Sequence, residues 1–152
     1  GRNMKKSFHT GTVKKSITIK KPKKTVWRKI SNIINLPEWL VDVKKTVFLS
    51  KTKRGVGAVR KITFADGNTI EEHVVLWNNG ESFTYVATEG LPLRVYVATI
   101  SLKSNGNKKT IVTWQSYLNS KKMTKKQFME FLAFMGSFYE ASLENLKTKI
   151  EK

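Results

Sequence analysis

Arg60, Glu71 and His73 are the ionisable residues of this sequence that could together form a binding or catalytic site. They lie on either side of Asp66-Gly67, a dipeptide that favours a tight hairpin. If Asp66 and Gly67 are the two loop residues, Arg60 faces His73, and all three ionisable side chains share one face of the hairpin. The aromatic bulk of that face predicts that it points into the protein. A slip of one residue in the pairing would reverse this orientation.

An arginine and a glutamate on neighbouring strands suit two kinds of site. In an enzyme, Glu71 would act as a general base while Arg60 stabilises developing negative charge. A guanidinium lowers the pKa of a nearby carboxyl group, so this role needs burial to oppose that effect. In a binding protein, Arg60, Glu71 and His73 would meet the polar ends of a ligand. The structural alternative is an ion pair between Arg60 and Glu71 that only supports the sheet, with His73 as an ordinary core histidine.

Six further candidates for ligand contact are aromatic or apolar. Three of them carry hydroxyl or indole N–H groups on later strands, and such groups need partners when they are buried. The other three lie on one face of the C-terminal helix, where they would border a cavity or pack as core. These candidates are Tyr85, Tyr96 and Trp114 on the strands, and Phe131, Met135 and Phe138 on the helix.

The segment 121–152 predicts a single long helix. It contains no proline, and its apolar residues recur at steps of three and four. Thr124, with Gln127 three residues later, matches a capping box at the start. Gly136 is expected to let the helix bend or a ligand approach. So long an apolar face needs a wide concave partner, and the residues expected to pack on the sheet are Leu143, Leu146 and Ile150.

Upstream of this helix, alternating patterns predict seven strands. The first is followed by a helix over 23–34 and a short helical turn over 36–40, and short turns link the other six. The predicted strands are 12–20, 44–49, 57–64, 69–77, 83–88, 94–102 and 110–118. This order predicts an α+β protein whose antiparallel sheet curls to bury one face. We expect 1–11 to be a disordered or tag-derived lead-in, with the native start at Met4, and 12–152 to form one domain.

Composition narrows the function classes. The chain has 152 residues and a formal net charge of +18, to which lysine contributes 24 of the 29 basic residues. It has no cysteine and two histidines, so we expect neither a metal nor a cofactor. No apolar run approaches the roughly 20 residues of a membrane span, which predicts a cytoplasmic protein. The charge is compatible with a solvated surface, or with weak electrostatic contact with nucleic acid or an anionic membrane.

Several segments, none specific alone, occur in an order and spacing that resemble a known family. They are 19–22, Val26-Trp27, 36–39, 55–60, 66–72, 83–85, 91–96 and 110–114. Together they resemble the SRPBCC superfamily, also called START-related or birch-pollen-allergen-like, in its polyketide cyclase/dehydrase and lipid-transport branch. The resemblance implies a helix-grip fold. In that fold a curved seven-stranded antiparallel sheet wraps around a long C-terminal helix, two short helices join the first two strands, and a cavity lies between sheet and helix.

The resemblance also implies roles for individual residues. In relatives of the plant hormone receptor type, an arginine and a glutamate at positions matching Arg60 and Glu71 face the cavity. The loop carrying Asp66-Gly67 matches a gate over the pocket, but it is shorter here, which argues against a closing gate of the receptor kind. Residues 89–92 would form the opposite lip. The pair Lys44-Lys45 lies on the strand that supplies an anion-binding lysine in those receptors.

Three functions follow as hypotheses. The first is binding, or transport, of a small hydrophobic or amphipathic ligand such as a lipid or polyketide. The second is an enzyme of the cyclase, dehydratase or isomerase type that uses Glu71 and Arg60. The third is a basic surface that docks on nucleic acid or anionic membrane. Fold alone does not decide between them, because members of this superfamily bind lipids, hormones or polyketides and only some are enzymes.

Overall fold

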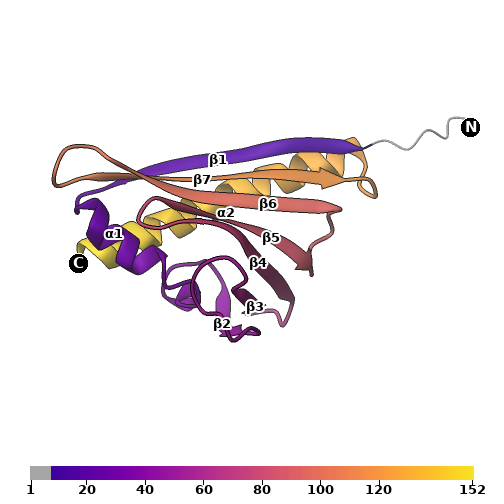
Figure 1. Ribbon diagram of the computed structural model, residues 1–152. Helices are drawn as coiled ribbons and strands as arrows, with labels where there is room; N and C mark the ends of the chain where they lie inside the picture. Colours follow the sequence, from indigo (N-terminus) through magenta and orange to yellow (C-terminus); the bar gives the residue numbers. More distant parts are fainter. Residues whose placement is uncertain (1–7) are drawn as a thin grey trace, which may run out of the picture.

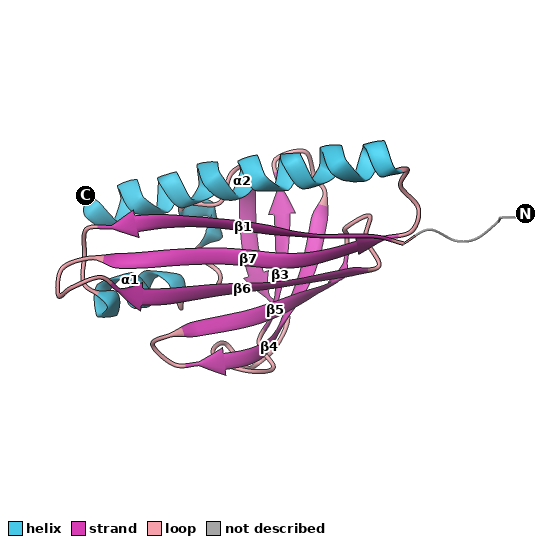
Figure 2. Ribbon diagram, turned by 90° about the horizontal axis from the view of Figure 1, so that it is seen from above, coloured by secondary structure: helices cyan, strands magenta, loops and turns pink. Residues whose placement is uncertain are grey.

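The computed structural model describes residues 8–152, and these residues form a seven-stranded antiparallel sheet curved around one long helix (Figures 1 and 2). The strands are β1 (His9–Ile19), β2 (Val43–Phe48), β3 (Val59–Phe64), β4 (Thr69–Asn78), β5 (Ser82–Glu89), β6 (Val95–Ser104) and β7 (Thr110–Ser120). The helices are α1 (Lys23–Ile30), the 3₁₀ turn η1 (Leu36–Glu38) and α2 (Lys125–Glu151). The sheet order is β1-β7-β6-β5-β4-β3-β2. This is the expected helix-grip architecture.

The first strand closes one edge of the sheet. β1 pairs antiparallel with β7 along its whole length, from His9 opposite Ser120 to Ile19 opposite Thr110. It therefore begins three residues before the predicted start, and residues 9–11 belong to the fold rather than to a lead-in. The rest of that predicted lead-in, with the expected start at Met4, lies outside the described residues.

The long helix begins with the predicted capping box. The Thr124 hydroxyl accepts a hydrogen bond from the Gln127 N–H at 3.1 Å, and the Gln127 side chain accepts one from the Thr124 N–H at 2.9 Å. Figure 2 shows α2 running alongside β1 and across the sheet. Its C-terminal half is anchored in the core as expected, since Leu143 and Leu146 are buried. Gly136 faces β1, where an added Cβ would lie 3.3 Å from Cε of Lys15, and it does not line the cavity described below.

Between β1 and β2 the chain makes a compact corner. The first helix ends at Ile30, four residues before the predicted end, and η1 follows. Trp27 anchors the corner because its ring packs edge-on against the rings of Trp77 and Phe83, with centroids 5.3 and 6.5 Å away. The corner thereby covers one end of the sheet's concave face (Figure 1).

The β3–β4 hairpin differs from the prediction by one residue in register. Its loop has three residues, because Phe64 N–H donates to the Asn68 carbonyl at 2.8 Å and Gly67 N–H donates to the Phe64 carbonyl at 2.9 Å. Gly67 takes the left-handed φ of +91° that closes such a loop. As a result Arg60 lies opposite Glu72 instead of His73. The predicted face of β4 is wrong: Glu72 and Val74 point into the protein, and Glu71 and His73 do not.

A β-bulge after Val74 in β4 makes the side chain of Trp77 point into the protein. The register with β5 shifts between Val74 and Leu76, which leaves both Val75 and Leu76 exposed. Trp77 then turns back and stacks on Phe83, with ring centroids 5.5 Å apart. A β-bulge of this kind changes which side chains reach the core without interrupting the sheet.

No helix within residues 8–152 is both long and apolar enough to cross a membrane.

Candidate functional site

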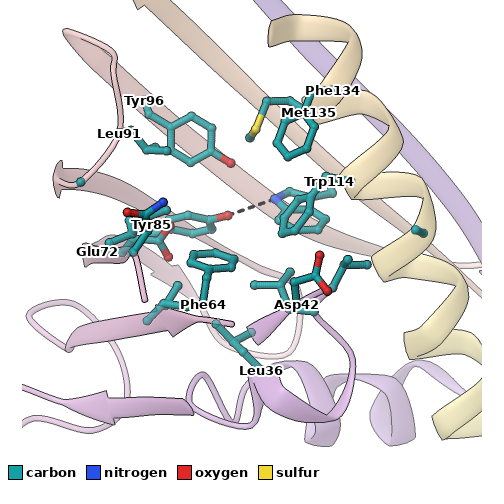
Figure 3. Close-up of a pocket in the computed structure, with 18 of the residues that line it drawn as sticks. Leu36, Asp42, Phe64, Glu72, Tyr85, Leu91, Tyr96, Trp114, Phe134 and Met135 are labelled. Atoms are coloured by element: carbon teal, nitrogen blue, oxygen red, sulfur yellow. Dashed lines mark hydrogen bonds between the residues drawn. The ribbon is translucent and has the colours of Figure 1, made fainter. Parts of the chain in front are cut away.

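A cavity of about 710 Å³ lies between the concave face of the sheet and α2. Its walls are largely apolar or aromatic, which is typical of pockets that bury most of a small ligand. Figure 3 shows side chains from the sheet and from α2 pointing into the same space. The aromatic lining residues are Trp39, Phe64, Phe83, Tyr85, Tyr96, Trp114, Phe131, Phe134 and Phe138, and the aliphatic ones include Leu36, Ile62, Ile70, Leu91, Ile100 and Met135.

The mouth of the cavity is formed by two loops and one side of α2. The β3–β4 loop contributes Ala65, Asp66 and Asn68, and the β5–β6 loop contributes residues 90–92. Most of these lining residues are exposed, as is Phe134 on α2, whose side chain is 61% exposed. The β5–β6 loop packs closely against the start of β4, because a Cβ added at Gly90 would lie 2.1 Å from the Thr69 carbonyl oxygen. The expected lips of the pocket therefore lie at its opening.

A buried ion pair forms the polar part of the cavity wall. Arg60 Nε and Nη2 donate to the same carboxylate oxygen, Oε1 of Glu72, at 3.0 and 2.8 Å. Arg60 Nη1 donates to the Ile33 carbonyl at 2.7 Å, which ties the β3–β4 hairpin to the α1–η1 corner. The guanidinium also lies over the Tyr85 ring, 4.9 Å from its centroid. Three of the five N–H groups of Arg60 are thus committed to the protein itself.

The second carboxylate oxygen of Glu72 has no hydrogen-bond partner among residues 8–152. The side chain is only 7% exposed, and it lines the cavity. Burial raises the pKa of the Glu72 carboxyl, and the adjacent Arg60 charge opposes this increase. Oε2 is therefore an acceptor that a ligand inside the cavity could reach.

Tyrosine hydroxyls form a second polar group in the cavity wall. The Trp114 indole N–H donates to the Tyr85 hydroxyl at 3.1 Å, as drawn in Figure 3. The Tyr96 and Tyr139 hydroxyls are hydrogen bonded to each other, and Tyr139 stacks on Trp114 with ring centroids 3.8 Å apart. Burial raises the pKa of Tyr85, Tyr96 and Tyr139 well above the ordinary tyrosine value. These phenols stay protonated at neutral pH and provide neutral hydrogen-bonding groups.

Most of the residues proposed from the sequence line this cavity. Arg60, Tyr85, Tyr96, Trp114, Phe131, Met135 and Phe138 do so. Glu71 and His73 lie on the opposite face of β4, where His73 Nε2 is 3.8 Å from a Glu71 carboxylate oxygen. The pair Lys44-Lys45 is exposed and does not line the cavity, so neither residue can hold an anion inside it.

Sequence reasoning missed three important lining residues. Glu72 was assigned to the wrong face because the loop before it is one residue longer than assumed. Asp42 follows η1 in a stretch with no periodic pattern, and Phe134 was not among the helix residues expected to border the cavity. The available signal was that Phe134 lies three residues after Phe131 and four before Phe138, within about one helical turn of both. No group of three or more potential metal ligands occurs within the described part of the chain.

Comparisons with known proteins agree with this architecture. A family model described as "Polyketide cyclase / dehydrase and lipid transport" matches residues 10–151. An uncharacterised protein from Bacillus thuringiensis is similar in structure, with a TM-score of 0.80, 23% identity, and coverage of 93% of this chain and 100% of that one. The ZhuI aromatase/cyclase from Streptomyces sp. R1128 has a TM-score of 0.81, 13% identity and 94% coverage of both chains.

A START superfamily protein from Mycobacterium smegmatis gives a TM-score of 0.76 at 14% identity, covering 92% of this chain and 97% of that one. No curated protein matches the sequence significantly. At these identities the solved structures show a shared fold.

Proposed function

The chain belongs to the polyketide cyclase/dehydrase and lipid transport family, and on this premise we propose that it binds a small hydrophobic or amphipathic ligand between the sheet and α2. The observation that supports this most is the cavity of about 710 Å³, which has largely apolar walls and one unpaired carboxylate oxygen on Glu72. The apolar part of the ligand would contact the aromatic walls, and a hydrogen-bond donor on it would meet Glu72. If the protein transports this ligand, the ligand would enter and leave the cavity through the mouth.

A titration with a neutral fluorescent probe, N-phenyl-1-naphthylamine, tests this proposal. Ile70 lies on the inner face of β4 and lines the cavity, so Ile70→Trp would fill part of it. Leu76→Trp places the same side chain on the same strand at a position that is 59% exposed, and it serves as the matched control. The wild type and Leu76→Trp should bind the probe saturably at one site, while Ile70→Trp should weaken binding at least tenfold. Equal affinity in all three proteins would refute binding in the cavity.

An enzymatic role is the second candidate, and Glu72 rather than Glu71 is the residue that favours it. Burial raises the pKa of Glu72 although Arg60 is paired with it, which makes its ionised form a better base than a solvent-exposed glutamate. In a cyclase of the aromatase type, Glu72 would remove a proton next to a ketone, and the resulting enolate would attack a second carbonyl of the same chain. Loss of water from the new ring would complete the reaction.

Turnover of a linear poly-β-ketone thioester tests this second candidate. The wild type should increase the fraction of ring-closed product over the uncatalysed mixture, and Glu72→Gln should remove the increase while still binding N-phenyl-1-naphthylamine. Glu71→Gln is the matched control and should leave the product distribution unchanged, because Glu71 lies outside the cavity. If Glu72→Gln retains the activity, Glu72 is not the base.

A further inference from the structure

The charges that line the cavity have the opposite balance to the rest of the protein. The whole chain carries 29 basic and 11 acidic residues. The cavity is lined by three acidic residues, Asp42, Asp66 and Glu72, and by one basic residue, Arg60. Asp42 and Asp66 are the only two aspartates in the sequence, and no lysine within residues 8–152 lines the cavity. A ligand therefore encounters acceptor groups and negative charge at this site.

Among residues 8–152, only one of these four charged groups has no protein partner. Glu72 is paired with Arg60, and Arg60 is committed to Glu72 and the Ile33 carbonyl. Asp66 accepts two hydrogen bonds from Asn68, at 2.9 Å each. The carboxylate of Asp42 has no hydrogen bond or ion pair with any residue of the described chain. In Figure 3 it points into the cavity from the same side as Phe64.

The backbone places Asp42 at the mouth in an unusual conformation. Its φ of +58° is the only left-handed value at a non-glycine residue within residues 8–152. Its carbonyl accepts a hydrogen bond from the Ala65 N–H at 2.7 Å, which joins the segment after η1 to the β3–β4 loop. Asparagine and aspartate tolerate this region better than other non-glycine residues. A strained residue held in place at a cavity mouth is consistent with a binding role.

Aromatic rings extend from the interior to the mouth on the α2 side of the cavity. Phe138 lies 6.3 Å from Phe64, 6.3 Å from Trp114 and 6.2 Å from Phe134, measured between ring centroids. Aromatic faces attract cations and repel anions through the ring quadrupole, and desolvation strengthens the effect. An unpaired carboxylate and an aromatic surface in one cavity form the combination that recognises an ammonium group.

We propose that the cavity prefers an amphiphile bearing a protonated amine, with the ammonium group at Asp42 and the apolar part inside. This inference rests on the proposed binding function and specifies the ligand class. A fatty acid or other anionic amphiphile would find no unpaired cation among the described residues that line the cavity. The +18 charge of the whole molecule opposes the entry of a cation, so the preference must come from the local groups.

Competition by three ligands of equal chain length tests the preference. Decylamine, decanol and decanoate, each below its micelle concentration, would displace N-phenyl-1-naphthylamine at pH 7 in 0.15 M and 0.5 M NaCl. Higher salt suppresses non-specific attraction of decanoate to surface lysines. We expect the amine to bind at least fivefold more tightly than the alcohol, the carboxylate to bind most weakly, and the preference to persist or increase at 0.5 M.

Two single-charge variants locate the recognition. Asp42→Asn keeps a residue that tolerates positive φ and should reduce the preference for amine over alcohol to less than twofold. Asp66→Asn removes the same charge from a carboxylate that is already hydrogen bonded, and it should retain most of the preference. A tighter affinity for decanoate than for decylamine in the wild type, or an unchanged preference in Asp42→Asn, would overturn the inference. Either result leaves ligand binding intact, whereas equal probe binding by Ile70→Trp and the wild type would refute the proposed function itself.

Discussion

Arg60 holds Glu72 through one oxygen and leaves the other facing the cavity. A buried charge is costly without its partner, while replacing both partners by apolar groups is often neutral. The pair therefore does two things: it joins the β3–β4 hairpin to the α1–η1 corner, and it keeps an acceptor inside an otherwise apolar space. The ion pair between Arg60 and Glu71 that was considered from the sequence is wrong, because Arg60 pairs with Glu72.

Removing one member of this pair should destabilise the protein strongly. We expect Arg60→Met to lower the free energy of unfolding by about 3–5 kcal/mol, because it leaves the Glu72 carboxylate unpaired in the core. The double variant Arg60→Met/Glu72→Met should recover most of this loss. Urea denaturation measures the free energy of unfolding of the single and the double variant. Glu71→Gln serves as a surface control and is expected to change stability by about 0.5 kcal/mol or less. A double variant as unstable as the single one would contradict the account.

The buried tyrosines predict a loss of stability at high pH. Tyr85, Tyr96 and Tyr139 have pKa values raised by burial, so the folded state keeps three phenol protons that the unfolded state releases near pH 10. Stability conferred by a raised pKa is present below the unfolded value and is lost as pH rises above it. Three such groups give a slope of about 4 kcal/mol per pH unit.

Absorbance of tyrosinate at 295 nm, followed together with near-UV circular dichroism, measures this effect. The three buried tyrosines should ionise only as the dichroism signal disappears. Tyr96→Phe should reduce the slope of stability against pH by about one third. Ionisation of all three near pH 10 in a protein that remains folded would contradict their burial in a hydrogen-bonded wall.

Some residues that line the cavity could be predicted from the sequence and others could not. The difference is whether neighbouring residues alone determine the direction of the side chain. Tyr85, Tyr96 and Trp114 were proposed because they carry hydroxyl or indole N–H groups on predicted strands, and all three line the cavity. Glu72 was missed because the same Asp-Gly signal fits loops of two and three residues, and the choice reverses the face of β4. Asp42 was missed because its position depends on the left-handed turn after η1 and on the contact with Ala65, which no pattern encodes.

Each of the two loops at the cavity mouth contains a glycine with positive φ, but the two glycines are required for different reasons. Gly90 has a φ of +100°, and a Cβ there would lie 2.1 Å from the Thr69 carbonyl oxygen. Gly67 has a φ of +91°, but a Cβ there would have no atom within 4 Å. Substitution at Gly67 therefore costs only backbone strain, of about 1–2 kcal/mol. Substitution at Gly90 also forces the β5–β6 loop away from β4.

We therefore expect Gly90→Ala to destabilise the protein clearly more than Gly67→Ala and also to change probe binding, since it opens the mouth. Urea denaturation gives the first quantity, and titration with N-phenyl-1-naphthylamine gives the second. Gly67→Asn is the conservative control, because asparagine tolerates positive φ. Equal losses for the two alanine variants would show that contact between the loops does not matter.

The elements themselves were largely predictable, and their boundaries were less so. The capping box of α2 and all seven strands follow from local patterns, since periodicity and turn residues are read over short stretches. The first helix is shorter than predicted, because the chain turns at Ser31 and packs its corner against Arg60. The bulge after Val74 is likewise set by pairing with β5, and no local pattern of β4 reports it.

For the whole molecule, the positive charge and the cavity are separate features. Every lysine in the described part of the chain lies outside the cavity lining, so the positive charge of these residues acts at the surface. Contact with nucleic acid or an anionic membrane remains a prediction from the sequence. Such contact should be non-specific and should weaken steeply as salt is added, because it depends on the release of counterions.

Binding to a fluorescent duplex DNA, and to vesicles containing phosphatidylserine, should fall at least a hundredfold between 50 and 300 mM NaCl. Binding of neutral N-phenyl-1-naphthylamine should stay constant over the same range, which separates the surface from the cavity. Affinity for DNA that is independent of salt would indicate a specific nucleic-acid site and would contradict this separation.

The most direct test of ligand binding in the cavity is a methyl NMR titration with N-phenyl-1-naphthylamine. Ring currents from a bound aromatic ligand shift only nearby methyl groups, so the shifts locate it. Binding in the cavity should cause large shifts for the Met135 ε-methyl and the δ1-methyls of Ile62, Ile70 and Ile100, all of which line the cavity. The exposed Leu49, Val56 and Leu76, which do not line it, should be unchanged. Shifts confined to the exposed methyl groups, with none at Met135, would contradict the account.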